Sequence, residues 1–373
     1  MARKLSKEMF AYLNNFYKTY QKTIAPIFEI YEAERKNKLA TLFCVGVLLF
    51  FMTLIVVMDF ISGNAFSRTD LFAFILFEMI IGIVSCVALI LLPFHFNSKF
   101  VDKLKHSCMD KLLSVFGNIN WYDKTDLISD AQLSASNLFA RYNIRHSFDS
   151  FSGVYKGVKF EICETEMLHQ TGSGKNRRVE TIFKGVVMKF KANKNINSNT
   201  IIATKGDKKI KNRTCFSAVG MLGLLNVFRC GCSLSSFIIF LLLILLAIVV
   251  VILVNRFFQH DEINWQEIKL EDPEFNKKYR AYSGNQVEAR YLITPAFMER
   301  FKNIQTSFGT DKVKCSFYQD NIMFAISTYK NLFEIGNMWI SLDNPKQLEI
   351  FFNELSSIFM LVDYFKLSEK TGL

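Results

Sequence analysis

The sequence predicts an α+β membrane protein: an N-terminal transmembrane helical hairpin, a cytoplasmic domain of mixed helices and antiparallel strands, and a hydrophobic helical insertion. Three observations predict it. Two long apolar segments lie in the first hundred residues, strand-like and helical hydrophobic patterns follow, and a third apolar segment interrupts those patterns. The expected parts are an amphipathic cytoplasmic helix (1–38), the hairpin (39–93), the first part of the domain (94–213), the insertion (214–256) and the second part (257–373).

The hairpin is predicted from length and from the turn residues between its arms. Residues 39–61 are almost wholly apolar, and as a helix they would reach roughly 34 Å, enough for a hydrocarbon core of about 30 Å. Residues 71–92 form the second arm, and we expect Pro93 to end it. The short loop between the arms leaves only an antiparallel pair.

Lysine and arginine counts predict the orientation. Residues 1–38 carry eight, the loop between the arms carries one, and residues 94–112 carry four. The positive-inside rule therefore places the N-terminus and everything after Pro93 in the cytoplasm. The formal charge of +11 has no nucleic-acid-binding motif beside it, so we expect contact with anionic membrane lipids and no nucleic-acid partner.

Two acidic residues fall within the predicted spans. Asp59 lies near the end of the first, and Glu78 lies about a third of the way along the second. Buried acids in membranes can mark ion paths, but such paths normally need several groups. We therefore expect Glu78 to reach the interface or pair with a neighbouring helix.

The third apolar segment, 216–254, consists of two pieces separated by Arg229-Cys230-Gly231-Cys232-Ser233. The second piece is long enough to span a membrane, whereas the first would reach only about 20 Å. A re-entrant, bent or tilted hairpin with Arg229 at its turn is expected, and a single crossing stays open. The basic residues before it form a candidate lipid-facing patch: Lys205, Lys208, Lys209, Lys211 and Arg213.

The other segments show conventional patterns. Apolar residues before the first span predict an amphipathic helix, interrupted near Pro26, that lies on the membrane or packs on another helix. Asp272 and Thr294 each precede a proline as helix caps. Further helices are expected at 99–116, 126–142 and 345–365, and strands at 158–168, 178–191, 200–204, 313–318 and 322–328.

No residue pattern predicts a catalytic, cofactor or metal site. Gly172-Ser173-Gly174-Lys175 lacks the further glycine and the Ser or Thr that a phosphate loop requires. Cys230 and Cys232 could bind metal or carry an acyl chain, but small turn residues are the favoured reading. Glu164 and Glu166 share one strand face; a solvated edge is favoured, and an enzyme hypothesis would need them or Arg290 in a pocket.

Several segments resemble the bacterial membrane proteins catalogued as domain of unknown function 3137. They are Phe151-Ser152-Gly153, Gly157-Val158-Lys159-Phe160-Glu161, Phe183-Lys184-Gly185, Leu270-Glu271-Asp272-Pro273-Glu274-Phe275 and, most specifically, the run from Gln286 to Glu299. The resemblance implies a cytoplasmic α+β domain tethered to the bacterial inner membrane, and it supplies no catalytic residues. The segment 216–254 departs from it as an insertion.

These observations lead to three hypotheses of function. The first is a non-enzymatic, multi-pass inner-membrane protein whose domain binds another membrane protein or assembles into a homo-oligomer. The second is a lipid-binding or transport component that uses the insertion and its basic flank. The third is an enzyme with an unrecognised site. Because resembling segments lie on both sides of the insertion, an even number of crossings or a re-entrant hairpin is favoured.

Overall fold

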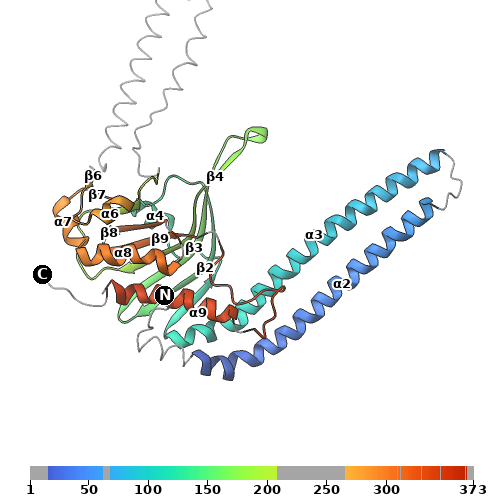
Figure 1. The fold of residues 1–373 in the computed structure, drawn as a ribbon, viewed down its shortest axis with the longest axis horizontal. Coiled ribbons are helices and arrows are strands. Elements are labelled where there is room, and N and C mark those ends of the chain that lie inside the picture. The colour runs from blue at the N-terminus through green and yellow to red at the C-terminus, as the bar shows by residue number, and fades with distance from the viewer. Residues whose placement is uncertain are drawn as a thin grey trace, which may run out of the picture.

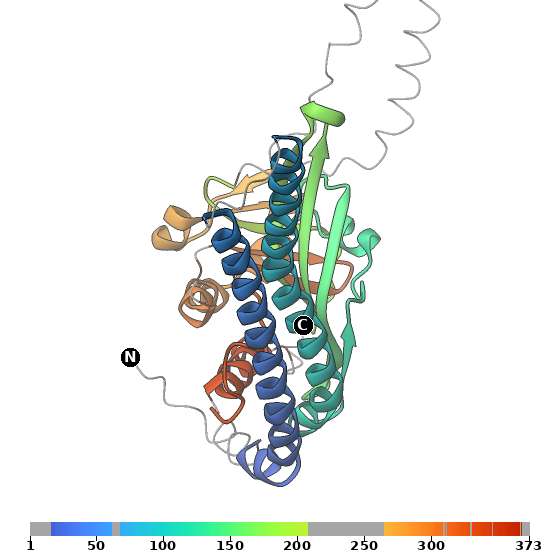
Figure 2. The same cartoon turned by 90° about the vertical axis from the view of Figure 1, so that its right-hand side faces the viewer.

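The computed structural model describes residues 16–61, 68–207 and 265–367, apart from a few single positions in the last range. Two long helices, α2 (Ala25–Ile61) and α3 (Arg68–Leu113), run antiparallel and extend together beyond the other described elements (Figures 1 and 2). Within the described residues one helix, Phe16–Ile55, is long and apolar enough to cross a membrane. None of its apolar window is buried, which is unlike the core helix of a soluble protein.

The helical segment that leads into α2 packs on the domain. The side chains of Phe16, Ile24 and Phe28 are buried, and the ring of Phe16 lies 4.8 Å from that of Phe352. The predicted interruption near Pro26 takes the form of a π-helical turn, η1 (Tyr20–Ile24), with helix on both sides. Proline cannot donate the regular helical hydrogen bond and its ring crowds the preceding turn, so a wider turn placed before it is physically reasonable.

Helix α3 continues through Pro93 to Leu113, so the prediction that Pro93 ends this helix is wrong. An interior proline costs about 3 kcal/mol. The turns after it offset this cost because they bury Phe100, Leu104 and Leu112 completely, and each such side chain contributes roughly 1.5–3 kcal/mol. The predicted boundary between hairpin and domain therefore falls inside one helix, and the predicted helix at 99–116 is its end together with η2 (Ser114–Phe116).

A single sheet of nine antiparallel strands, in the order β1-β2-β3-β4-β9-β8-β5-β7-β6, forms the body of the described chain. The predicted α+β class with antiparallel strands is confirmed. The strands are β1 (Ile119–Asp123), β2 (Ile144–Tyr155), β3 (Val158–Thr171), β4 (Arg178–Lys191), β5 (Thr200–Thr204), β6 (Gln266–Ile268), β7 (Tyr279–Ser283), β8 (Val313–Tyr318) and β9 (Asn321–Ser327).

Shorter helices complete the fold: α4 (Asp130–Ala135), η3 (Gly174–Asn176), α6 (Pro273–Lys278), α7 (Gln286–Leu292), α8 (Pro295–Phe308) and α9 (Lys346–Tyr364). The predicted strands at 158–168, 178–191, 200–204, 313–318 and 322–328 all correspond to strands, and α9 matches the predicted final helix. The helix predicted at 126–142 is largely wrong, because only α4 forms there. Strands β1, β2, β6 and β7 were not predicted.

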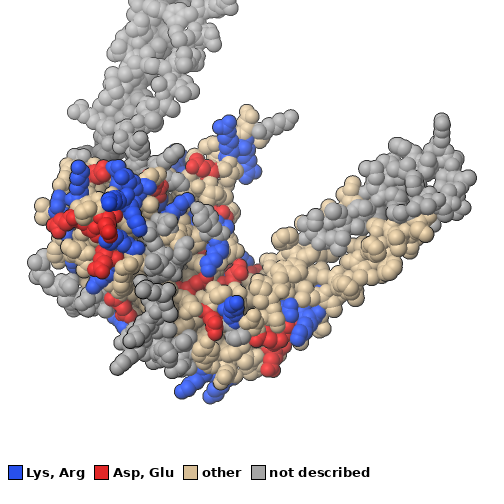
Figure 3. Space-filling model, in the orientation of Figure 1, with Lys and Arg blue, Asp and Glu red and all other residues tan. Residues whose placement is uncertain are grey.

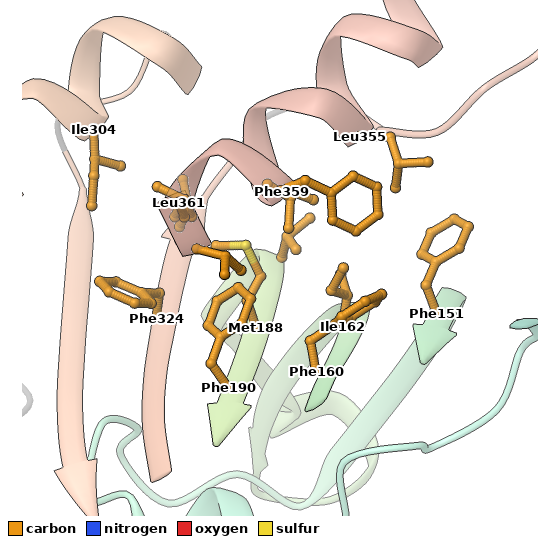
Figure 4. Close-up of a cluster of buried hydrophobic side chains, with 14 of the residues drawn as sticks. Phe151, Phe160, Ile162, Met188, Phe190, Ile304, Phe324, Leu355, Phe359 and Leu361 are labelled. Carbon is orange, nitrogen blue, oxygen red and sulfur yellow. The ribbon is translucent and has the colours of Figure 1, made fainter. Parts of the chain in front are cut away.

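The sheet carries a hydrophobic core on each face. On one face α8, α9 and the domain end of the helix pair cover strand residues such as Phe160, Phe190 and Phe324 (Figure 4). Phe359 of α9 lies at the centre of this face, 5.3 Å from the ring of Phe160. The other face has a smaller core under the β1–β2 connection, where Leu133 packs near strand residues. The helix pair is therefore attached to the larger core.

The cap at the start of α6 offers a local test. The Asp272 carboxylate accepts hydrogen bonds from the N–H groups of Glu274 (2.8 Å) and Phe275 (3.1 Å), and it pairs with Lys302 at 2.6 Å. Lys302 holds the pKa of Asp272 below its usual range. We expect Asp272→Ala to lower the free energy of unfolding by about 1–2 kcal/mol, measured by denaturant titration in mild detergent.

The exposed neighbour Glu271 provides the matched control. Glu271→Ala removes a carboxylate of the same motif that caps nothing in the described chain, so its effect should stay within about 0.5 kcal/mol. Equal effects of the two substitutions would show that the cap does not stabilise the domain.

Candidate functional site

The loop between β9 and α9, residues 330–344, lies against the domain ends of α2 and α3 (Figure 1). We call it the junction loop. It contains neither strand nor helix, so its buried backbone groups need partners other than a regular ladder. Side chains from α2, α3, β3 and α9 supply them.

A buried ion pair on α2 forms one half of this contact. Glu32 and Arg35 lie one helical turn apart, and their side chains are only 4% and 10% exposed. Two parallel hydrogen bonds join them, from Nε to Oε2 at 2.7 Å and from Nη2 to Oε1 at 2.6 Å. Such a bidentate pair restricts the orientation of both groups. It leaves further polar atoms free to bind the loop.

Both members of the pair bind the junction loop. Arg35 donates to the carbonyl oxygen of Met338 at 3.1 Å, and Glu32 accepts the N–H of Leu342 at 3.0 Å. From the other helix, Asn97 accepts the N–H of Met338 at 2.9 Å. The backbone of one buried residue is thus held by α2 on one side and by α3 on the other. We call this contact of Glu32, Arg35 and Asn97 with Met338 and Leu342 the clasp.

The contacts of the clasp lower the pKa of Glu32. Hydrogen bonds from Arg35 lower the pKa of Glu32 to about 2, against the opposing effect of burial. The bond from the Leu342 N–H acts in the same direction. Glu32 is therefore ionised across the physiological range.

The first residues of the junction loop are held by two other acids. Glu164 of β3 accepts the N–H of Leu332 at 2.9 Å, and Glu354 of α9 accepts the N–H of Phe333 at 2.8 Å. Phe333 has a positive φ of 57°, which a non-glycine residue adopts only where its surroundings hold it. Its ring lies 4.8 Å from that of Phe151 on β2.

Glu164 is the most perturbed acid of this region. Only 4% of the residue is exposed, and burial raises the pKa of its carboxyl to about 8. The negative charge of Asp149 acts in the same direction, whereas the Leu332 hydrogen bond and Lys105 oppose it. Glu164 is therefore largely protonated at neutral pH while its oxygen still accepts from the loop.

A second buried ion pair links α3 to the sheet. Asp149 of β2 is 3% exposed, pairs with Lys105 of α3, and accepts the indole N–H of Trp121 at 2.9 Å. Trp121 belongs to β1, the strand that contacts α3. Together with the clasp, this contact holds the helix pair in one orientation relative to the sheet.

Of the predicted basic patch, only Lys205 lies within the described residues. Lys205 is exposed in the turn after β5, where its N–H donates to the carbonyl oxygen of Lys278 at 2.8 Å. Lys208, Lys209, Lys211, Arg213 and Arg229 lie outside the described residues, as do Cys230 and Cys232. Asp59 and Glu78 belong to α2 and α3, but their side chains are not described.

The acids of the enzyme hypothesis are only partly brought together. Glu164 and Glu166 share one face of β3 as predicted, but the prediction of a solvated edge is wrong for Glu164, which is buried on an inner strand. Glu166 is partly exposed, with its carboxylate 3.8 Å from Lys184. Arg290 lies on α7, near the β7–β6 end of the sheet, and so lies far from β3 (Figure 1). In the described ranges no group of three or more His, Cys, Asp or Glu side chains could hold a metal.

Sequence reasoning missed the clasp residues. Glu32 and Arg35 have the i,i+3 spacing of a helical ion pair, immediately before an apolar span. That spacing was the available signal, but lysines surround it and make the segment resemble a solvated face. Asn97 carries no signal of its own, because its partner is 241 positions away in sequence.

The family comparison covers the later half of the chain. The model of the family described as Protein of unknown function (DUF3137) matches residues 181–367, just over half of the 373 residues. The match begins within β4 and includes β5 to β9, α9 and the junction loop, whereas the resembling segments at 151–153 and 157–161 precede it. No curated protein and no solved structure matches the chain. The chain belongs to the DUF3137 family.

Proposed function

We propose that this protein is anchored in a membrane by α2 and α3 and that its sheet domain binds another protein, either a second copy or a different membrane protein. Large apolar side chains along the outer part of both helices are exposed, among them Phe43, Leu48, Ile83 and Leu91. In the face of Figure 3 the described part of α2 below the grey region shows a stretch without Lys, Arg, Asp or Glu. A continuous apolar surface of this size is typical of contact with lipid.

The helix pair is a better candidate for a permanent anchor than for a removable signal sequence. Phe16, Ile24 and Phe28 belong to the main hydrophobic core, and Glu32 and Arg35 hold the junction loop. Cleavage after α2 would remove all of them. The lysine and arginine bias of the segments around the helices favours a cytoplasmic domain. The resemblance to bacterial membrane proteins of this family extends the proposal to the bacterial inner membrane.

The sheet also bears on the number of membrane crossings. Strand β5, before the segment 208–264, pairs with β7 and β8, which follow that segment. Strands of one sheet occupy one compartment, so positions 207 and 265 lie on the same side of the membrane. We therefore propose an even number of crossings, or none, between them.

The observation that carries the protein-binding proposal is a projecting two-stranded arm. Strands β3 and β4 continue beyond their neighbours: β2 pairs with β3 only as far as Leu168, and β9 pairs with β4 only from Gly185. The remaining hairpin, with its tip at 172–177, stands clear of the body (Figure 1). In the described chain the outer edge of β4 from Arg178 to Thr181 has no strand partner.

Gly185 marks the point where the arm begins. Its φ is +150°, and a Cβ atom there would lie 2.1 Å from the carbonyl oxygen of Ile326. The residue pairing of β4 with β9 ends at Gly185. Beyond it Val179 is 50% exposed, and Arg177 and Arg178 give the tip a basic surface (Figure 3). An open strand edge with an exposed apolar side chain suits pairing with a strand of another chain.

The test places a photo-cross-linking amino acid at Val179 in the full-length protein in its native membrane. We expect covalent products whose mass identifies a second copy or a different protein. Val287 on α7, which is 80% exposed, is the matched control position and should give none. Products at neither position, or equal products at both, would contradict a role of the arm.

A second variant removes the arm and keeps the parts of β3 and β4 that pair with β2 and β9. Residues 169–180 are replaced by Asn-Gly, which closes a two-residue turn because Leu168 and Thr181 are cross-strand partners. The shortened protein should fold with an unchanged unfolding midpoint and lose the larger assembly that the wild type shows by mass analysis in mild detergent. A wild-type protein that is monomeric and without partners in this measurement would contradict the proposal that the arm binds another protein.

A further inference from the structure

The junction loop exposes two large apolar residues beside the helix pair. Trp339 is 58% exposed and Ile340 is 41% exposed, directly after the fully buried Met338. Asn337 holds the backbone of these two residues in a turn, because its side-chain oxygen accepts the N–H of Trp339 at 2.9 Å and that of Ile340 at 3.0 Å. A folded turn rather than a loose segment therefore presents them.

The clasp determines how far along the helices this turn lies. Met338 is bound through its carbonyl oxygen to Arg35 and through its N–H to Asn97. Arg35 precedes the apolar part of α2 by four residues, and Asn97 follows Pro93 by four residues. At 1.5 Å per residue, both anchors lie about 6 Å from the ends of the two apolar segments.

That distance places the turn at the boundary between lipid and water. A bilayer has a hydrocarbon core of about 30 Å within a total of about 40–45 Å, so each headgroup layer is about 5–7 Å thick. Leu39 and Leu42 of α2 and Phe96 of α3 pack on the same core cluster as Met338. The turn thus reaches the height at which the helices become apolar.

The chemistry of the turn and its surroundings suits this position. Tryptophan concentrates at membrane interfaces because its ring is apolar while its N–H needs a polar partner. Lys36 and Lys99 lie close to the two anchors and are exposed, so they can contact anionic headgroups. The side chain of Phe94, 72% exposed, marks the start of the apolar surface of α3.

From this arrangement we infer that Trp339 and Ile340 insert into the interfacial layer of the bilayer and form a third membrane contact of the domain. The inference rests on the proposed membrane anchorage by α2 and α3. If the two helices were its only membrane contact, the domain would be free to tilt relative to the plane of the membrane. A contact beside them, held by the clasp, restricts that tilt and sets the orientation of the projecting arm.

The test measures quenching of tryptophan fluorescence by brominated lipids. The full-length protein is placed in nanodiscs of phosphatidylcholine and phosphatidylglycerol, with bromine either near the headgroup end or near the terminus of the acyl chains. The signal of Trp339 is the difference between the wild type and Trp339→Phe, which leaves Trp121 and Trp265 untouched. We expect the shallow bromines to reduce this difference signal by about half and the deep bromines to reduce it less.

Two control variants, both in the Trp339→Phe background, separate the inference from the anchorage on which it rests. Phe94→Trp reports the helix pair, and Val154→Trp reports an exposed position on β2 next to the turn before β3, at the sheet end opposite the arm. We expect Phe94→Trp to be quenched and Val154→Trp not to be. Quenching of Phe94→Trp without quenching of Trp339 would overturn the inference and leave the anchorage standing. Quenching of neither would overturn both.

Discussion

Arg35→Ala should open the clasp and destabilise it by about 3–5 kcal/mol, the usual penalty for leaving one partner of a buried ion pair alone. Glu32 would keep its buried charge without the guanidinium that compensates it, and the carbonyl oxygen of Met338 would lose its donor. Amide hydrogen exchange of the full-length protein in mild detergent measures the effect. The N–H groups of Met338 and Leu342 should exchange about a hundred-fold to several thousand-fold faster.

Lys36→Ala is the matched control for this experiment. Lys36 lies next in sequence and also approaches Glu32, with Nζ 3.5 Å from the carboxylate, but its side chain is 63% exposed. An exposed pair of this kind contributes about 0–1 kcal/mol, so exchange at the junction loop should hardly change. Equal acceleration by both substitutions would mean that the junction loop is not held by the buried pair.

The same pair predicts a dependence on acid. The pKa of Glu32 is about 2 in the folded protein, against an ordinary value of 4.5. A carboxyl whose pKa is lowered by folding stabilises the native state above its unfolded pKa. That contribution is lost as the pH falls from about 4.5 towards 2. Protection of the junction loop should therefore decrease in this window in the wild type.

Glu164→Gln should stabilise the protein in alkaline solution, with the opposite pH dependence. Because burial raises the pKa of Glu164 from 4.5 to about 8, the folded state binds more protons than the unfolded state between these values. Stability of the wild type therefore falls as the pH rises through this window. Glutamine cannot ionise and keeps an oxygen for the Leu332 N–H. Above pH 8 the variant should exceed the wild type by up to about 4–5 kcal/mol.

Denaturant titrations of both proteins in mild detergent, from about pH 5 to about pH 9, test this expectation. The two free energies of unfolding should nearly coincide at the acidic end and diverge towards the alkaline end. Glu166→Gln is the matched control, since Glu166 lies on the same face of β3 but is partly exposed near Lys184. A constant difference between wild type and Glu164→Gln across the pH range would show that Glu164 does not titrate as stated.

The sequence alone predicted elements whose identity depends on neighbouring residues. Strands β4, β5 and β8 have the predicted bounds, because apolar alternation and turn residues on either side define them locally. Strand β2 was missed because it carries polar residues such as Asp149 and Ser150 that are buried by contacts from elsewhere. Strand β6, with three residues, is too short for a periodic signal of its own.

The candidate site was less predictable than the fold, and the reason is sequence separation. The strand position of Glu164 was recognised, but its burial depends on Leu332, which is 168 positions away. The continuation of α3 through Pro93 likewise depends on a core that buries Phe100 and Leu104. Local rules give the cost of an interior proline, whereas only the packed structure supplies the contacts that offset it.

The sequence by itself determined the α+β class, the helical and strand character of most of the chain, and the family to which the chain belongs. Only the tertiary structure decided which charged residues are buried and what they hold. Arg35 is one of many basic residues before an apolar segment, and it acquires a role through Met338, 303 positions later. Burial of a charge depends on what distant segments bring to it, and no local pattern contains that information.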